Sequence, residues 1–222
     1  MTIADNYQRL LEQIETIAQR VGRRPAEICL VAASKGRLLS QILEAYEAGC
    51  RHFGENRLQE LQDKQPEAPK DIQWHFIGTL QRNKVRSALA SGLELIHAVD
   101  TLPLAEKVAL IEGQEQVKTP ILIQVNISGE KSKHGFSPEG CRAVFEVLPA
   151  LPIVGLMTMA PECADERTIR SCFIQLRQLR DSLTTPERPL YHLSMGMSED
   201  FPIAIEEGAT LLRLGSALFD MP

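Results

Sequence analysis

Short apolar segments alternate with amphipathic segments along nearly the whole chain, and this alternation constrains the fold more than any other feature. Each apolar segment is almost continuous, which is typical of strands buried on both faces of a parallel sheet. Strand, helix and strand in succession form the repeating unit of such a sheet. Eight apolar segments are present, at residues 28–33, 51–56, 73–78, 95–99, 121–126, 153–158, 190–194 and 211–215.

Amphipathic segments of helical period fill the intervals and also precede the first strand. Eight strands separated by helices within 222 residues predict a single (β/α)8 barrel over residues 1–222, with an extra helix at the N-terminus. A doubly wound open sheet is the alternative. No Pro-, Gly- or Ser-rich linker divides the chain, so a second domain is not expected. The predicted helices cover residues 6–21, 38–48, 58–64, 82–89, 101–114, 138–148, 166–183 and 198–207.

Composition narrows the choice of partners. The formal net charge is −5 and charges of both signs are mixed along the chain, so we expect small molecules or proteins as partners, and no nucleic acid. No segment is apolar enough to span a membrane and no targeting signal is evident, so we expect a cytoplasmic protein, and a monomer. The cysteines are odd in number and share no C-x-x-C spacing, which predicts reduced structural thiols at Cys29, Cys50, Cys141, Cys163 and Cys172.

Lys35 lies at the carboxyl end of the first predicted strand, directly before Gly36. Barrel enzymes build their active sites at this end of the strands. A lysine there can form a Schiff base with a carbonyl compound when desolvation or nearby charge lowers its pKa. The alternative is a solvated surface lysine, because most lysines at strand ends are of that kind.

Small and hydroxyl residues follow the last two predicted strands. Barrels often bind phosphate at these two loops, where glycine lets the backbone approach the anion and serine donates a hydrogen bond. The alternative is that these are ordinary turn and capping residues, since a serine before the acidic pair Glu199-Asp200 caps a helix well. The candidates for a phosphate site are Ser194, Gly196, Ser198, Gly215 and Ser216.

Arg213 interrupts an otherwise apolar strand, between Leu212 and Leu214. A buried guanidinium needs a partner. That partner is either a carboxylate such as Glu55 or a ring nitrogen or phosphate of a ligand, and we favour the ligand.

Two further polar residues belong to predicted strands on the amino-terminal side of the chain. His75 is either a core histidine satisfied by a neighbour or part of the site. Asn56 either hydrogen-bonds a ring hydroxyl of a ligand or caps the helix that follows it. The remaining histidines lack metal-binding spacing and are expected to lie far apart, at His52, His97, His134 and His192.

Taken together, these segments resemble the pyridoxal phosphate homeostasis protein family, in the family's order and over nearly the whole length. The resemblance implies a barrel like the N-terminal domain of alanine racemase that binds pyridoxal 5′-phosphate (PLP) as a Schiff base on Lys35. The segments that carry it are 33–35, 53–56, 74–84, 155–159, 193–200 and 213–219, and the Leu156-Met157-Thr158-Met159 run resembles the cyanobacterial branch.

The same resemblance assigns roles around the cofactor. It implies that Arg213 faces the pyridine nitrogen and that Asn56, His75 and Met157 lie around the ring. Two departures from the family pattern bear on access to the cofactor: Arg57 stands where many members have tyrosine, and Gly36 where a hydroxyl or bulkier residue is common. The phosphate would be held by Ser194, Gly196, Gly215 and Ser216, with help from Ser198.

An arginine at the ring nitrogen keeps that nitrogen unprotonated, which weakens the ring as an electron sink. Racemases of this fold also take a tyrosine base from a second domain, which we do not expect in a sequence that ends at Pro222. The resemblance therefore implies a non-catalytic carrier or regulator in vitamin B6 and amino-acid or keto-acid balance, which delivers PLP to PLP-dependent apoenzymes. The alternatives are an amino-acid racemase and a barrel enzyme in which Lys35 forms a Schiff base with a sugar phosphate.

Overall fold

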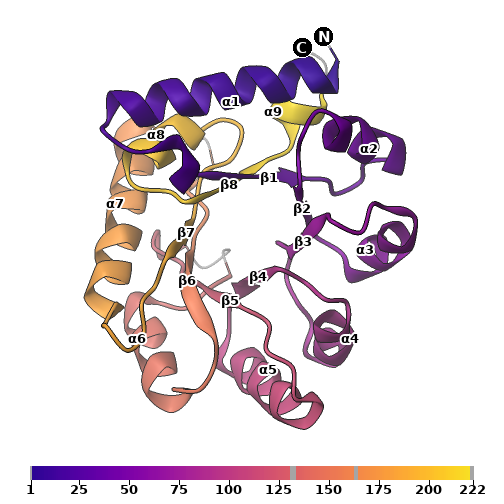
Figure 1. Cartoon of the computed structure of the whole chain (residues 1–222). Helices are drawn as coiled ribbons and strands as arrows, with labels where there is room; N and C mark the ends of the chain where they lie inside the picture. The colour runs from indigo at the N-terminus through magenta and orange to yellow at the C-terminus, as the bar shows by residue number, and fades with distance from the viewer. Residues whose placement is uncertain (1, 131–133, 163–164, 221–222) are drawn as a thin grey trace.

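The computed structural model describes residues 2–130, 134–162 and 165–220. Eight parallel strands close into a barrel in which neighbours in sequence pair and β8 pairs with β1. The strands ring the centre and the helices lie outside them (Figure 1). The predicted (β/α)8 barrel is confirmed, and the open sheet is wrong. The strands are β1 (Cys29–Ala33), β2 (His52–Glu55), β3 (Gln73–Phe76), β4 (Leu95–Val99), β5 (Ile121–Gln124), β6 (Ile153–Met157), β7 (His192–Ser194) and β8 (Leu211–Leu214).

The helices follow the predicted order with three differences. The helix expected at 198–207 begins only at Phe201, and the one expected at 82–89 divides into a 3₁₀ turn (Arg82–Lys84) and α4. A short helix that the sequence did not predict, α9, follows β8 directly. The helices are α1 (Ile3–Arg20), α2 (Leu39–Glu47), α3 (Leu58–Lys64), α4 (Val85–Ala90), α5 (Leu102–Glu115), α6 (Pro138–Val147), α7 (Glu166–Leu183), α8 (Phe201–Glu206) and α9 (Ser216–Phe219), and further 3₁₀ turns lie at Pro25–Glu27 and Gln65–Glu67.

Side chains along each strand alternate between the barrel interior and the layer of helices, as the pleat requires. Outward-facing side chains such as Phe53, Trp74 and Phe76 join the large core that the helices cover. A separate, smaller apolar cluster fills the interior of the barrel. Its buried members are Val31, Leu95, Ala98, Leu122, Met157 and Leu211.

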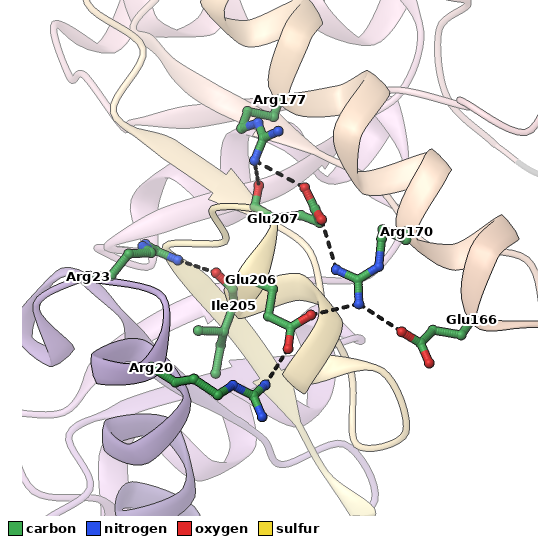
Figure 2. Close-up of polar contacts among 8 residues, drawn as sticks. All are labelled: Arg20, Arg23, Glu166, Arg170, Arg177, Ile205, Glu206 and Glu207. Atoms are coloured by element: carbon green, nitrogen blue, oxygen red, sulfur yellow. Dashed lines mark hydrogen bonds and ion pairs between the residues drawn. The ribbon is translucent and has the colours of Figure 1, made fainter.

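The N-terminal helix α1 lies beside α8 and α9 on the outside of the barrel (Figure 1). Charged side chains join it to the barrel through α8. Arg20 pairs with Glu206, and Arg23 donates a 2.8 Å hydrogen bond to the backbone near the end of α8. Arg170 of α7 contacts Glu206 at 2.7 Å and Glu207 at 2.9 Å (Figure 2). These contacts fix the segment that leads from the loop after β7 into β8.

The described cysteines fit the predicted structural role. Burial raises the pKa of the thiols of Cys29, Cys50 and Cys141 to about 12, so they stay protonated and unreactive at neutral pH. Cys172 is buried as well, and Cys163 lies outside the described residues. Among the helices that the structure describes, none is both long and apolar enough to cross a membrane.

Candidate functional site

Lys35 lies in the turn after β1, at the carboxyl end of the barrel. The residue before it, Ser34, is buried, whereas Lys35 is exposed and makes no hydrogen bond or ion pair with any described residue. Gly36 adopts a φ of +67°, a backbone conformation that favours glycine. Its N–H donates to Glu60 Oε2 at 2.9 Å. The turn is thus anchored while the lysine amine is left unpartnered.

A buried ion pair fixes the strand end next to Lys35. Glu55, at the end of β2, is fully buried and accepts hydrogen bonds from Lys64 Nζ at 2.6 Å and Ser34 Oγ at 2.7 Å. Lys64 also donates to the backbone carbonyl of Ser34 at 3.0 Å. Burial raises the pKa of the Glu55 carboxyl, and the bonds from Lys64 and Ser34 oppose that rise. The cluster fixes the position of Ser34. It therefore also fixes the direction in which the chain enters the Lys35 turn.

The loops after β7 and β8 are tied to each other. Gly196 adopts a φ of +97°, and a Cβ there would lie 2.6 Å from Ala204 Cβ, so the position excludes a side chain. Ser198 Oγ accepts a hydrogen bond from the N–H of Ala217 at 3.1 Å. Gly215 and Ser198 are half-buried, and Ser216 is exposed. The two loops therefore present glycine backbone and serine hydroxyls on one surface.

The alternative role of Ser198 as the cap of the next helix is wrong. The residue before α8 is Asp200, and that helix has no side-chain cap bond. Asp200 instead accepts from the N–H of Met197 at 2.5 Å, within the loop. Ser198 serves α9, because a helix start leaves N–H groups without partners inside the helix.

Arg213 is buried in β8 and donates to two groups inside the barrel. Its Nη1 donates to Ser194 Oγ at 2.6 Å and its Nη2 to the carbonyl of Thr158 at 3.0 Å. Glu55 pairs with Lys64, so the alternative of a Glu55–Arg213 pair is wrong. Burial lowers the pKa of Arg213 to about 10, which leaves the guanidinium charged at neutral pH. Its Nε makes no hydrogen bond to any residue that the structure describes, so this N–H remains available to a ligand.

Ser194 lies in a different place from the other phosphate candidates. It is fully buried inside the barrel, at the end of β7. Its hydroxyl contacts Arg213 on one side and His97 Nδ1, at 2.8 Å, on the other. Ser194 is therefore a partner of Arg213 in this structure, and it does not share the exposed surface of Gly215 and Ser216.

Three histidines form a hydrogen-bonded chain across the barrel interior. His52 Nδ1 lies 3.0 Å from His75 Nε2, and His75 Nδ1 lies 2.9 Å from His97 Nε2. The expectation that His52 and His97 lie far apart is wrong, because His75 links them. Burial lowers the pKa of His75 to about 3 and that of His97 well below its ordinary value, so both are neutral. Within the described ranges no group of histidine, cysteine and carboxylate side chains is arranged to hold a metal ion.

Asn56 and Met157 complete the predicted set. Asn56 is half-buried, and its side chain makes no hydrogen bond with the described residues. The cap position of α3 belongs to Arg57, so the capping alternative for Asn56 is wrong. Asn56 lines a cavity of about 360 Å³ together with Phe76 and Lys84. Met157 is buried in the interior cluster. A larger cavity of about 610 Å³, between α5 and residues 147–151, contains none of the predicted site residues.

The predicted residues thus fall into two groups. One lies at the carboxyl-end loops and turns, and the other lies inside the barrel, where both ring nitrogens of His75 are already bonded to other histidines. The residues that the sequence analysis missed are His52, His97 and Lys64. The alternation of β2, β3 and β4 carries the signal for the two histidines, because it places them on the same face as His75. The mouth group is Lys35, Asn56, Gly196, Ser198, Gly215 and Ser216, and the interior group is His75, Met157, Ser194 and Arg213.

The barrel, the strand-end lysine and the loops after β7 and β8 are features of the class of barrels that includes the N-terminal domain of alanine racemase. The family described as alanine racemase, N-terminal domain, matches residues 6–221. The structure of alanine racemase from Corynebacterium glutamicum superposes with a TM-score of 0.71 at 15% identity, over 98% of this chain and 61% of that one. At that identity the similarity shows the shared fold alone.

Proteins of higher identity give a narrower assignment. Pyridoxal phosphate homeostasis proteins from Aquifex aeolicus and Pseudomonas aeruginosa are each 40% identical, over 99% and 98% of this chain and 98% and 95% of their own lengths. The structure of PipY from Synechococcus elongatus with PLP bound is 37% identical, with a TM-score of 0.85, over 98% of this chain and 100% of that one. The chain belongs to the pyridoxal phosphate homeostasis protein family, as the sequence segments indicated.

Proposed function

We propose that this protein binds PLP at the carboxyl end of its barrel, holds it on Lys35, and acts in PLP homeostasis without using it in catalysis. The observation that carries the proposal is the unpartnered amine of Lys35 at the mouth of a barrel in which the loops after the neighbouring strands β8 and β7 are built from glycine and serine. The PLP-bound structure of PipY, a relative at 37% identity, supports it.

The residues present fit the cofactor. A phosphate suits the loops after β7 and β8, where Gly196 cannot carry a side chain and Ser198 joins the two loops. The ring nitrogen suits Arg213, which has an uncommitted Nε–H donor and stays charged. Asn56 has an uncommitted amide for a ring hydroxyl. No side chain in this set has to break a bond to another side chain in order to contact the ligand.

Lys35 supplies the covalent anchor. PLP brings an aldehyde and a pyridine ring that can accept an electron pair. The Lys35 nitrogen bonds to the aldehyde carbon, and the aldehyde oxygen leaves as water with two hydrogens of the ammonium group, the third returning to solvent. The ion pair of Glu55 with Lys64 keeps the strand end fixed while this bond forms.

The properties of Arg213 favour a protein that holds PLP over one that uses it in catalysis. A guanidinium that remains charged donates to the ring nitrogen and opposes its protonation, which weakens the ring as an electron sink. The two bonds from Arg213 to Ser194 and to the Thr158 carbonyl fix that donor in place. Such a site suits a protein that keeps the aldehyde bound and delivers it to PLP-dependent apoenzymes in the cytoplasm, working as a monomer.

Absorbance spectroscopy tests the proposal. Protein mixed with PLP and freed of excess ligand is expected to show the visible band of a Schiff base, and Lys35→Ala is expected to lose it entirely. Lys70→Ala, which changes another exposed lysine, is the matched control and keeps the band. Wild-type protein without a band would contradict the proposal and favour the sugar-phosphate alternative.

A racemase is the second candidate, because the barrel is shared with alanine racemase. It predicts exchange of the Cα hydrogen of alanine or serine for deuterium at high protein concentration, lost in Lys35→Ala. We expect no exchange, because Arg213 disfavours the carbanion that exchange requires.

A further inference from the structure

A continuous hydrogen-bonded chain runs from the mouth of the barrel towards its opposite end. It begins at Arg213, passes through Ser194 at the end of β7, and reaches His97, His75 and finally His52, the first residue of β2. The successive separations are 2.6, 2.8, 2.9 and 3.0 Å. Four of the five side chains are buried, and His52 is half-buried.

The hydroxyl of Ser194 sets the direction of this chain. Its oxygen accepts from Arg213, whose nitrogens are all donors. Its own hydrogen needs an acceptor, since a buried hydroxyl without one loses the hydrogen bond that it makes to water in the unfolded chain. The single acceptor that the described residues offer it is His97 Nδ1. Ser194 therefore donates to His97.

That bond fixes the tautomer of each histidine in turn. A neutral His97 that accepts at Nδ1 carries its hydrogen on Nε2, and it donates from there to His75 Nδ1. By the same reasoning His75 carries its hydrogen on Nε2 and donates to His52 Nδ1. A protonated imidazole would break the order, because it is a donor at both nitrogens.

The surroundings keep the chain neutral. Burial is the main cause that lowers the pKa of His97, and electrostatic repulsion from His75, Arg213 and His192 lowers it further. Burial also lowers the pKa of His52, with Glu94 opposing. His192 lies beside the chain but bonds elsewhere, 3.4 Å from Thr210 Oγ1.

We propose that His97 is the positioning residue for Arg213, and that His75 and His52 hold His97 in the tautomer which this role requires. By taking the Ser194 hydrogen, His97 leaves the Ser194 lone pairs directed at the Arg213 guanidinium. The inference rests on the proposed function in so far as Arg213 contacts the cofactor ring. The order of hydrogens is a property of the protein alone.

Long-range ¹H–¹⁵N NMR of histidine-labelled protein at pH 7.5 tests the order without any ligand. We expect His52, His75 and His97 each to show a protonated Nε2 and an unprotonated Nδ1. His134 is exposed and His192 lies outside the chain, so both serve as internal references. A hydrogen on Nδ1 of His97 or His75, or a charged ring there, would overturn the proposal.

Two serine variants separate the chain from the loops. Ser194→Ala removes the hydroxyl that directs the order, and we expect the shifts of His97 and His75 to change. Ser198→Ala removes a hydroxyl that bonds only Ala217 among the described residues, and we expect the histidine shifts to stay as in the wild type. Equal histidine spectra for the two variants would contradict the proposal.

The positioning role is tested by PLP affinity, read from the visible band. His97→Phe is expected to weaken PLP binding about tenfold, which corresponds to about 1.4 kcal/mol, and to shift the band because Arg213 loses its fixed geometry. His192→Phe is the control and is expected to bind as the wild type does. If the wild type shows no band, the proposed function fails while the NMR result still decides the order. If the wild type binds PLP and His97→Phe binds it equally well with an unshifted band, the positioning role is wrong.

Discussion

The neighbouring strands β1 and β8 use their cationic groups in opposite ways. On the side of β1, Lys35 is exposed and has no partner among the described residues. On the side of β8, Arg213 is buried, bonded to Ser194 and Thr158, and supported by three histidines behind Ser194. A group that has to bond with an incoming aldehyde must be left uncommitted, whereas a group that sets the electronics of a bound ring must be fixed beforehand. Lys35 is therefore left free to react with an aldehyde, and Arg213 is fixed in position before a ligand binds.

Acid is expected to destabilise the histidine chain behind Arg213, and this is the largest effect on the free energy of unfolding that we predict. His75 has a pKa of about 3 in the folded protein, and the pKa of His97 is also far below the ordinary value. Because these folded-state pKa values are depressed, the stability they confer is present above about pH 6.5 and is lost as the pH falls. Between pH 7 and pH 5 His75 alone should lower the free energy of unfolding by about 2 kcal/mol, and His97 should lower it further.

Urea unfolding at a series of pH values measures this dependence. In His75→Phe the free energy of unfolding should fall less between pH 7 and pH 5, because the contribution of His75 is absent. This difference does not depend on the absolute stability of the variant. An equal fall in the wild type and in His75→Phe would show that His75 is charged or open to water in the folded protein, and neither state is compatible with a buried, neutral chain.

Removing the ion pair beside Lys35 is expected to destabilise the end of β2 and the Lys35 turn next to it. Lys64→Ala leaves Glu55 fully buried without its cation, and should lower the free energy of unfolding at pH 7 by about 3 kcal/mol. Lys70→Ala, on the exposed surface, should change it by less than about 0.5 kcal/mol. Chemical denaturation of the two variants in parallel makes the comparison, and similar losses in both would contradict a structural role for the pair.

Two glycine substitutions test the role of the Lys35 turn, with a smaller expected effect on stability. Gly36 has a φ of +67°, so Gly36→Ala should destabilise the turn by about 1 kcal/mol and weaken PLP binding by moving Lys35. Gly113 lies in α5 with open space around it, so Gly113→Ala should stabilise the protein by about 0.5–1 kcal/mol. Thermal unfolding with PLP titration records both, and an unaffected PLP affinity in Gly36→Ala would show that the turn does not place the lysine.

The fold could be predicted from the sequence because each strand and helix is encoded locally. Apolar runs such as 95–99 and the amphipathic run at 166–183 match the structure at both ends. Lys35 and the serine and glycine loops could also be placed at one end of the barrel, because parallel strands end together. Helix α9 was missed because four residues are too few for a periodic pattern.

The contacts inside the barrel could not be predicted from the sequence. His52 is in register with Gln73, yet its ring bonds His75, two residues further along β3. Such diagonal contacts depend on the stagger of the closed barrel, which no local pattern encodes. The same holds for Ser194, whose neighbours Arg213 and His97 are distant in sequence and on different strands. Lys64 ends a predicted helix, and no local pattern links it to Glu55, nine residues earlier in the chain.

Peptide mapping after reduction tests the central claim most directly. Borohydride converts a lysine Schiff base into a stable amine, so protein loaded with PLP, reduced and digested should carry one modified lysine, at Lys35. Lys35→Ala treated in the same way should carry none. A modification on another lysine with Lys35 unmodified, or equal labelling of the variant, would contradict the claim that the unpartnered amine at the end of β1 holds the cofactor.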